Sequence, residues 1–402
     1  MANSEAYIVD ILRTPVGRFG GTLSSVRPDD MAAFVIKALM ERQGNVPPGE
    51  IEDVIFGAAN QAGEDNRNVA RMAALLADLP MSVAGVTVNR LCASGLQSIM
   101  DASRAIKLGE GAAYVAGGVE SMTRAPYVLG KGNTAFDRKQ ELYDTSIGWR
   151  FINPALAKKH YPYGMGETAE NVADKWKISR EEQDVFAHGS QVKYQEAHEQ
   201  GKFHNELVGI TVPQRKKDPI IFDKDEHPRL SSVETLSGLR PAFRENGTVT
   251  AGNSSGINDG AAAALVVNES LLRSLDLTPM ARVVSMAVSG VEPEIMGIGP
   301  VPATRKALER AGLSLTDIGL IELNEAFAAQ SIACIRELAL DESIVNVNGG
   351  SIAIGHPLGA SGTRISATLL HEMQRRPEVK YGLATMCVGV GQGAAVIYEN
   401  LT

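Results

Sequence analysis

The segment KALERAGLSLTDIGLIELNEAF at 306–327 repeats a pattern already present at 37–60, where the chain reads KALMER and then IEDVIFGAAN. About forty residues beyond each acidic strand start comes a short glycine turn, CASG at 92–95 and GASG at 359–362. Because order and spacing are both kept, we interpret the two segments as copies of one unit. The sequence therefore predicts a two-fold pseudosymmetric fold whose halves each bring a glycine turn to a shared site.

Short β-branched runs alternate with amphipathic helical stretches, as in layered α/β proteins. Strands are expected at 6–11, 53–57, 113–116, 283–288, 319–323 and 383–387. Helices are expected at 30–42, 66–76, 95–108, 169–176, 180–200, 302–310 and 326–338. Between about 125 and 250 aromatic and charged residues become more frequent, which predicts an inserted region that shapes a substrate pocket. We expect an N-terminal half at 1–270, which includes this insertion, and a C-terminal half at 271–402.

The composition counts against several classes of protein. A net charge of −8 argues against a general nucleic-acid binder, whose surface would be basic. Three cysteines in 402 residues make no disulfide framework and lie too far apart for a zinc site, so we expect no metal. The N-terminus, MANSEAYIVDILRTP, has no secretory signal pattern. No window approaches the about 18 apolar residues of a membrane span, so we expect a cytoplasmic protein.

Two cysteines and a histidine lie inside glycine-rich turns: Cys92 in NRLCASG, His356 in GGSIAIGHPLGASG and Cys387 in CVGVGQG. Cys92 precedes a helical stretch, and the amides and dipole at a helix N-terminus favour a thiolate. An imidazole held on a rigid turn, as His356 is, takes a proton from a thiol and returns it. Two thiols and an imidazole suggest an acyl-thioester intermediate followed by proton transfer at carbon. We therefore interpret the chain as an enzyme.

The residues alone leave other interpretations open. Asn324 could orient a water or donate to a developing oxyanion, while Glu325 is equally explained as a carboxylate at a helix start. One cysteine and one histidine would suit a thioester hydrolase, and an idle acyl-CoA-binding subunit would keep the same fold. CVGVGQG superficially resembles a dinucleotide loop, but no suitable helix and acidic residue follow it. Histidines expected at the surface are His160, His188, His198, His204 and His227, and cations that could meet a phosphate are Arg215, Lys216, Lys217 and Arg229.

From Arg13 to the C-terminus the chain resembles the thiolase family. The resemblance rests on strings in the family's order: RTPVGRFGG (13–21), NRLCASG (89–95), AGGVESMTRAP (116–126), TAGNSSGINDGAA (250–262), NEAFA (324–328), GGSIAIGHPLGASG (349–362) and CVGVGQG (387–393). Ketoacyl synthases share the fold but have different cysteine and histidine contexts. The resemblance implies two pseudosymmetric βαβαβ-type halves in a layered α-β-α-β-α core with an inserted loop region.

The resemblance also implies a role for each candidate catalytic residue. Cys92 would carry the acyl group, His356 would activate it, and Cys387 would move a proton at the carbon alpha to the thioester. His356 and Asn324, the latter through a water, would form one oxyanion site. The backbone amides of Cys92 and Gly389 would form the other.

In this family coenzyme A is a substrate rather than a permanently bound cofactor, and it lies under the inserted region. Ser255 matches the position that contacts its pantetheine, and Arg229 matches an arginine near its nucleotide end. Positions of the pocket wall are matched by Met165, Ala251, Gly252 and Phe327. The resemblance implies acyl-CoA and CoA as partners, and a homodimer or homotetramer as the assembly.

The substrate is less closely defined by the resemblance. Short-chain biosynthetic thiolases commonly carry a histidine before the Met–Gly pair of the inserted region, where this chain has Gly164. The strings at 61–73 and 144–154 are instead similar to those of 3-oxoadipyl-CoA thiolases. A dicarboxylate would need a cation near its acyl end, for which Arg67 and Arg150 are candidates. We therefore expect degradative cleavage of a 3-oxoacyl-CoA, in fatty acid or aromatic catabolism, with acetoacetyl-CoA synthesis as the alternative.

Overall fold

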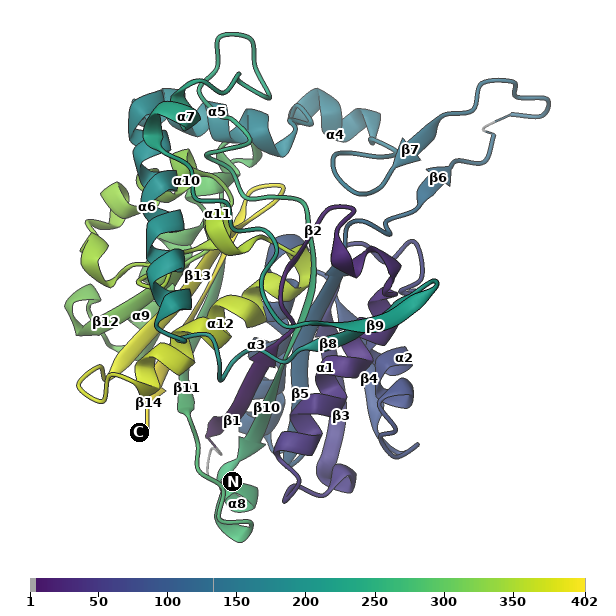
Figure 1. Cartoon of the computed structure of the whole chain (residues 1–402), viewed down its shortest axis with the longest axis vertical. Coiled ribbons are helices and arrows are strands. Elements are labelled where there is room, and N and C mark those ends of the chain that lie inside the picture. The colour runs from purple at the N-terminus through teal and green to yellow at the C-terminus, as the bar shows by residue number, and fades with distance from the viewer. Residues whose placement is uncertain (1–4, 133, 402) are drawn as a thin grey trace.

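The computed structural model describes residues 5–132 and 134–401 (Figure 1). In this part of the chain ten strands form one continuous sheet made of two units. The first unit has the order β4 (Ala84–Val88), β3 (Ile51–Gly57), β5 (Ala113–Ser121), β10 (Asn258–Asn268) and β1 (Ala6–Arg13), with β2 (Gly17–Arg18) beside β10. The second has the order β12 (Ile318–Leu323), β13 (Tyr381–Val388), β14 (Gln392–Asn400) and β11 (Ala281–Gly290). The units join through the pairing of Tyr7 and Ile8 with Arg282 and Ala281.

Both units repeat one pattern of strand pairing. β3 is parallel to β5, β5 is antiparallel to β10, and β10 is antiparallel to β1. In the same order β12 is parallel to β13, β13 is antiparallel to β14, and β14 is antiparallel to β11. The counterpart of β4 is a single parallel bridge between Ile321 and Val345. The predicted sequence repeat thus corresponds to a repeat in the topology.

Helices cover the outer faces of both units and fill the space between them. α1 (Pro28–Arg42) and α2 (Val69–Leu76) share an apolar cluster with the first unit, and α9 (Pro300–Ala311) and α10 (Ala328–Leu338) share one with the second. α3 (Ser94–Leu108) and α12 (Leu358–Gln374) lie in a central cluster that contains strands of both units. This arrangement confirms the predicted α-β-α-β-α layering.

The two central helices approach each other through glycines. A Cβ on Gly362 would lie 2.1 Å from the backbone nitrogen of Leu96, and one on Gly95 would lie 2.7 Å from the carbonyl oxygen of Gly359. Neither position has room for a side chain, so the close approach depends on glycine. The CASG and GASG turns therefore bring the N-terminal ends of α3 and α12 to one place, as the repeat predicts.

The inserted region is a mixture of helices and hairpins. Its elements are β6 (Tyr127–Leu129), β7 (Leu142–Asp144), α4 (Pro154–Lys159), α5 (Met165–Trp176), α6 (Arg180–Glu199), β8 (Ile210–Gln214), β9 (Lys217–Phe222) and α7 (Val233–Ser237). The β6–β7 hairpin projects from the body, while α4, α5 and α7 lie at one end of the molecule (Figure 1). The wholly buried Arg13 joins this region to β1 through ion pairs of 2.6 Å with Glu206 and 2.7 Å with Asp225.

Sequence reasoning missed some elements. It did not predict β10, β14 or α12, and the surface position expected for His227 is wrong because this side chain is buried. The remaining elements are α8 (Glu269–Ser274), α11 (Ser351–Ile354) and the 3₁₀ turns η1 (Thr22–Ser25), η2 (Pro48–Glu50), η3 (Leu91–Ala93), η4 (Pro293–Ile298), η5 (Leu315–Asp317) and η6 (Glu342–Ile344). None of the helices in residues 5–132 and 134–401 combines the length and apolar character needed to cross a bilayer.

Candidate active site

Cys92 lies in a constrained turn between β4 and α3. Leu91 adopts a left-handed φ of 47°, and its backbone nitrogen donates to Asn89 Oδ1 at 2.8 Å. Ser94 closes the turn, since its hydroxyl donates to the Leu91 carbonyl at 2.7 Å and accepts from the Arg90 nitrogen at 2.9 Å. Local hydrogen bonds therefore fix the backbone on both sides of the cysteine.

Burial dominates the charge state of Cys92. Cys92 is partly accessible as a residue, but the protein packed around its sulfur raises the pKa of the thiol to about 11. A hydrogen bond from the Gly389 backbone N–H acts in the opposite direction and is the weaker effect. Burial thus outweighs the effect of the nearby helix N-terminus, so Cys92 needs a base, the role that the resemblance implies for His356.

His356 is held in one orientation and one tautomer. Gly355, at a φ of 110°, turns the chain, and the His356 backbone nitrogen donates to Asn258 Oδ1 at 2.9 Å. The imidazole Nδ1 lies 2.6 Å from Ser361 Oγ, whose own proton goes to the Pro357 carbonyl at 2.8 Å. Ser361 must therefore accept from Nδ1–H, which leaves the lone pair of Nε2 free. We assign the proton to Nδ1 from this network.

The imidazole is also uncharged at neutral pH. Burial, with a further effect of the Arg364 charge, lowers the pKa of His356 to about 3. A neutral imidazole with a free Nε2 accepts a proton from a thiol, as a general base must.

Asn324 lies directly after β12 and is completely buried. Its Oδ1 accepts from the Ser351 hydroxyl at 2.6 Å, so its amide nitrogen is turned the other way. That nitrogen lies 3.5 Å from His356 Nε2, at the limit of a hydrogen bond. The structure thus brings Asn324 and His356 together as predicted. The neighbouring Glu325 instead accepts from Ser190, Asn346 and the Ile352 nitrogen, which is a structural role.

Cys387 lies at the end of β13, and Gly389 follows directly after this strand. Burial raises the pKa of the Cys387 thiol well above its usual value, and the nearby sulfurs of Cys92 and Cys334 raise it further. Cys387 is thus a protonated thiol in the same interior as Cys92. A Cβ on Gly389 would lie 3.1 Å from Leu91 Cδ1 and 3.6 Å from Met165 Sδ, so the glycine lets these elements meet.

Apolar side chains from the inserted region and the second unit form a wall beside Cys387. They make one cluster: Met165, Ala169, Val249, Met296, Ala326, Phe327 and Cys387. Two of the predicted pocket residues, Met165 and Phe327, therefore border the second thiol. Ser255 is close by, because its hydroxyl donates to the Ala326 carbonyl at 3.1 Å.

The other predicted CoA-binding residues line a separate small cavity. It measures about 170 Å³ and is lined by Gln191, Arg229, Ser231, Thr235, Leu236, Leu239, Ala251 and Gly252. Arg229 crosses one wall and donates to the Ala251 carbonyl at 2.6 Å. The structure thus brings Arg229, Ala251 and Gly252 together at a cavity formed by the inserted region.

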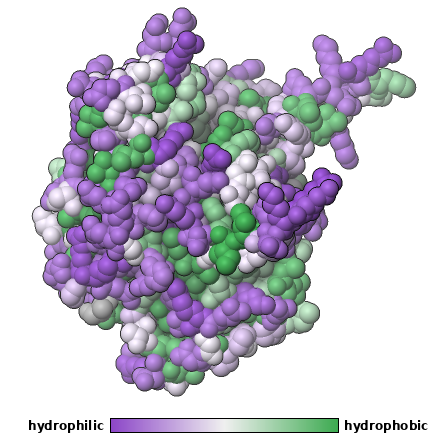
Figure 2. Space-filling model, viewed as in Figure 1, coloured by the Kyte–Doolittle hydropathy of each residue, from purple (hydrophilic) through white to green (hydrophobic). Residues whose placement is uncertain are grey.

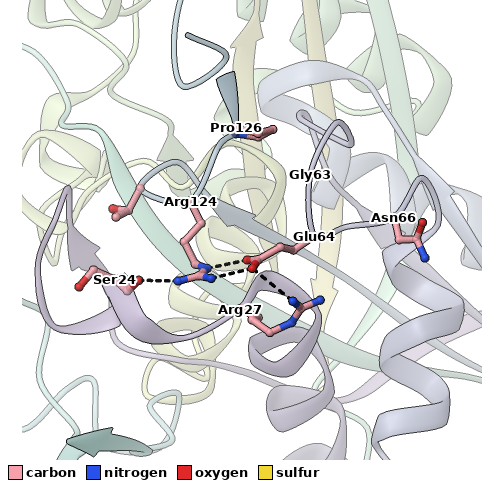
Figure 3. A pocket seen from close by; sticks show the side chains of 8 residues that line it. Ser24, Arg27, Gly63, Glu64, Asn66, Arg124 and Pro126 are labelled. Carbon is pink, nitrogen blue, oxygen red and sulfur yellow. Dashed lines mark hydrogen bonds and ion pairs between the residues drawn. The ribbon is translucent and has the colours of Figure 1, made fainter. Parts of the chain in front are cut away.

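A larger open hollow, of about 600 Å³, holds none of the candidate residues (Figure 3). Its charged side chains are already paired, because Glu64 accepts from Arg124 at 2.5 and 2.6 Å and from Arg27 at 3.2 Å, and Arg27 also pairs with Asp29 at 2.8 Å. No cysteine or histidine lies among the residues that line it. We therefore do not assign the chemistry to this hollow.

Sequence reasoning missed several residues of the site. Asn258, Ser351, Ser361 and Arg364 hold the imidazole and the amide in place, although three of them lie in strings that drew attention for other residues. The carboxylate of Glu120, in AGGVES, accepts from the Ala59, Asn60 and Gly359 nitrogens, and burial raises its pKa to about 7. A polar residue inside a glycine-rich string is the signal that could have found them.

Comparisons with known proteins give the family. The thiolase N-terminal domain matches residues 6–270, and the thiolase C-terminal domain matches residues 277–400. The chain therefore belongs to the thiolase family, a class of acyltransferases, and the predicted family and enzyme class are confirmed.

Similar proteins cover the whole chain. A 3-oxoadipyl-CoA/3-oxo-5,6-dehydrosuberyl-CoA thiolase of Escherichia coli K12 is 54% identical over 99% of this chain and 100% of its own. A β-ketoadipyl-CoA thiolase of Pseudomonas aeruginosa is 53% identical over 99% of both chains. The crystal structure of a Bacillus anthracis acetyl-CoA acetyltransferase superposes with a TM-score of 0.93 at 43% identity over the whole of both chains. That of a human mitochondrial 3-ketoacyl-CoA thiolase in complex with CoA has a TM-score of 0.91 at 41% identity, over 99% of this chain and 98% of its own.

Proposed function

We propose that this thiolase cleaves 3-oxoadipyl-CoA, with free CoA, to acetyl-CoA and succinyl-CoA in a reversible reaction. The observation that carries the proposal is that the turns of Cys92 and His356 meet, since a Cβ on Gly95 would lie 2.7 Å from the Gly359 carbonyl oxygen, and that they hold a protonated thiol and a neutral imidazole with an Nε2 lone pair. Cys387 supplies a second protonated thiol in the same interior. A thioester hydrolase needs no second cysteine. An idle binding subunit needs neither a thiol with a base nor a second thiol.

The first half-reaction forms an acyl-enzyme. His356 Nε2 takes the Cys92 proton, and the thiolate attacks the 3-keto carbon. The bond between the second and third carbons then breaks, and its electron pair forms the enolate of acetyl-CoA. The Cys387 thiol protonates that carbon, acetyl-CoA leaves, and the acyl group remains on Cys92.

The second half-reaction restores the enzyme. Incoming CoA gives its thiol proton to the Cys387 thiolate, and its sulfur attacks the acyl carbon. The bond to Cys92 breaks, and the departing sulfur recovers its proton from the His356 imidazolium. Cys92, His356 and Cys387 thus all regain their starting protonation states, the thiol proton of CoA replacing the one that left with acetyl-CoA, and synthesis is the same path in reverse.

Two separate oxyanion sites serve these steps. The Gly389 N–H, which hydrogen-bonds the Cys92 sulfur, and the Cys92 N–H would face the carbonyl oxygen of the acyl group on Cys92. The Asn324 amide, with a water, and His356 Nε2 would face the oxygen of the enolate. The enolate is the least stable species, so the cleavage step depends most on the Asn324 side.

CoA would extend from this site beneath the inserted region. Ser255 would contact its pantetheine chain, and Arg229 its nucleotide end, with Ala251 and Gly252 beside the path. Met165 and Phe327 would border the acyl chain next to Cys387. The CoA complex of the human relative supports CoA as the substrate.

The choice of 3-oxoadipyl-CoA rests on the names of the relatives from E. coli and P. aeruginosa, and on two free cations. Among the described residues, no carboxylate pairs with the half-buried Arg150 or the exposed Arg67. A substrate carboxylate would bind whichever of them borders the acyl end, with charge-assisted hydrogen bonds. Arg67→Met and Arg150→Met are both measured. The variant that removes the binding cation should lose about tenfold or more in kcat/KM for 3-oxoadipyl-CoA, and little for acetoacetyl-CoA.

We also propose a homo-oligomeric, cytoplasmic protein with halves at 1–270 and 271–402. The outer edge of β4 has no strand partner in the described part of the chain, and apolar Leu75, Leu76, Met81 and Val86 are exposed on or near it. An exposed apolar edge of this kind invites pairing with a second copy. The projecting β6–β7 hairpin also carries apolar surface (Figure 2). Phe136, between its two strands, is 95% exposed.

The assay that tests this function compares CoA-dependent cleavage of acetoacetyl-CoA, 3-oxoadipyl-CoA and a long-chain 3-oxoacyl-CoA. We expect the highest kcat/KM for 3-oxoadipyl-CoA. A preference for acetoacetyl-CoA would favour the biosynthetic alternative, which a relative from Cupriavidus necator named acetyl-CoA acetyltransferase, 47% identical, represents. Thioester hydrolysis or binding without cleavage would overturn the thiolase mechanism.

A further inference from the structure

We infer that Ser351 and Arg364 are positioning residues for the cleavage step, because together they fix which end of the Asn324 amide faces His356 Nε2. This inference rests on the proposed function and adds to it two side chains that act through Asn324. Both are buried, Ser351 at the start of α11 and Arg364 in α12.

The side chains from Arg364 through Asn324 to His356 form one hydrogen-bond network. The direction of each hydrogen bond follows from the groups at the two ends of this network. Arg364 has only donors, so its Nη2, 2.5 Å from Ser351 Oγ, must donate to that oxygen. The single Ser351 proton is then free for Asn324 Oδ1, 2.6 Å away. The Asn324 amide nitrogen is left to face the imidazole.

The His356 end of this hydrogen-bond network gives the same orientation of the Asn324 amide independently. The Pro357 carbonyl only accepts, so Ser361 donates to it and accepts from His356 Nδ1–H. His356 Nε2 is therefore an acceptor, and only the NH₂ end of Asn324 is compatible with it. A reversed amide would set an oxygen lone pair against a nitrogen lone pair.

The fixed amide matters for catalysis because the enolate oxygen needs a donor already in place. A donor that must first rotate forfeits the advantage of preorganisation. Ser351 and Arg364 thus hold the amide in its donating orientation before substrate arrives. Arg364 also places a positive charge close enough to lower the pKa of His356.

Other charged groups act on Arg364 itself. The Glu322 carboxylate, on β12, lies 3.6 Å from it, and burial raises the pKa of Glu322 to about 8. The remaining groups that influence the guanidinium are Glu206, Glu325 and Arg13. Removing Arg364 therefore disturbs a buried charge cluster, whereas removing the Ser351 hydroxyl leaves every charge in place. Ser351→Ala is the cleaner test.

The test compares Ser351→Ala with Ser103→Ala, a buried serine in α3 whose hydroxyl donates only to Ile99 of its own helix at 2.7 Å. Two rates are measured with each protein: cleavage of 3-oxoadipyl-CoA, and exchange of an acyl group between labelled CoA and acyl-CoA. For Ser351→Ala we expect kcat of cleavage to fall about tenfold, less than the ~10²–10³-fold loss of an oxyanion donor itself. Exchange, KM and the pH profile should change little.

Arg364 variants add a readout that a merely structural role would not move. Arg364→Met removes both the donor and the charge, so we expect slower cleavage and an acid limb of kcat/KM at higher pH, because the pKa of His356 rises. Arg364→Lys keeps a cation that donates, and should retain more activity than Arg364→Met.

The inference is overturned if Ser351→Ala matches Ser103→Ala in cleavage, or if cleavage and exchange fall together with a lower melting temperature. Wild-type protein that cleaves none of the 3-oxoacyl-CoA substrates would instead overturn the proposed function itself. The two failures are therefore distinguishable.

Discussion

At the scale of single residues, the central feature is that the Cys92 thiol and the His356 imidazole are both uncharged. Burial raises the pKa of Cys92 to about 11 and lowers that of His356 to about 3. Over the range between these values the site holds a thiol and a free imidazole, ready for a proton transfer when substrate binds. The reactive ion pair therefore forms only during the reaction.

This charge arrangement predicts an unusual pH dependence. A histidine with its ordinary pKa would lose activity below about pH 6.5, as the imidazole protonates. Here the pKa of His356 is lowered, so its base function persists down to about pH 3 and is lost only below that. We expect kcat/KM to stay nearly constant from about pH 5 to pH 9. An acid limb centred near the ordinary histidine value would contradict the assignment.

Cys387 and Cys334 offer a matched pair for mutation, since both are buried cysteines in the described part of the chain. Cys387→Ala should lower cleavage by about 10²–10⁴-fold, the range of general acid–base catalysis, because the enolate loses its proton donor. Acyl exchange between Cys92 and CoA should survive better than cleavage. The control Cys334→Ala should leave cleavage near its wild-type rate. Near-normal cleavage by Cys387→Ala would show that another group moves the proton.

The sequence predicted Cys92, His356 and Cys387 as candidates from their glycine-rich turns and Asn324 from its strand end, and the family resemblance added Gly389. It could not predict their charge states, which depend on groups far away in the chain. Asn258, which orients His356, lies on a strand 98 residues earlier in the sequence. No local pattern contains such a contact.

At the scale of elements, the site depends on how closely α3 and α12 approach. These helices carry the turns of Cys92 and His356, and their contact is made by glycine against backbone. The sequence repeat predicted both turns but not α12 itself. The apolar and small residues of α12 are buried all around the helix, so the segment lacks the one-sided pattern that marks a surface helix.

This packing predicts the effect of one methyl group. In Gly362→Ala the new Cβ would lie 2.1 Å from the Leu96 nitrogen, so the helices must move apart. A shift of about 1 Å between catalytic groups can cost about 10²-fold in rate, and we expect a loss of that order in cleavage.

The matched control is Gly189→Ala in α6, where a Cβ would meet nothing within 4 Å. That variant should keep its activity and unfold at the same or a higher temperature, because alanine favours a helix by about 1 kcal/mol over glycine. Equal activities of the two variants would show that the α3–α12 contact does not position the site.

At the scale of the whole molecule, the edge of β4 and the projecting β6–β7 hairpin carry apolar surface that residues 5–132 and 134–401 of one copy leave exposed. The family resemblance predicted an oligomer without indicating which surface would form it. The surface proposed above follows from the strand order, which cannot be deduced from one sequence. Only the folded sheet shows that β4 lies at an edge.

The edge predicts a variant that weakens assembly. Val86→Lys places a charge on the exposed strand, and charged residues at sheet edges oppose pairing between chains. We expect light scattering after gel filtration to show a smaller particle than the wild type. Val185→Lys, an exposed valine of α6, is the control and should leave the mass unchanged. An unchanged mass for Val86→Lys would place the interface elsewhere.

The most direct test of the central claim is to trap the acyl-enzyme. Wild-type protein is mixed with 3-oxoadipyl-CoA in the absence of free CoA, quenched in acid, and digested for mass spectrometry. The account predicts one succinyl group on the peptide that contains Cys92, with one acetyl-CoA released for each. Release of acetyl-CoA without an acyl group on Cys92, or acylation of Cys387 or Cys334 instead, would contradict it.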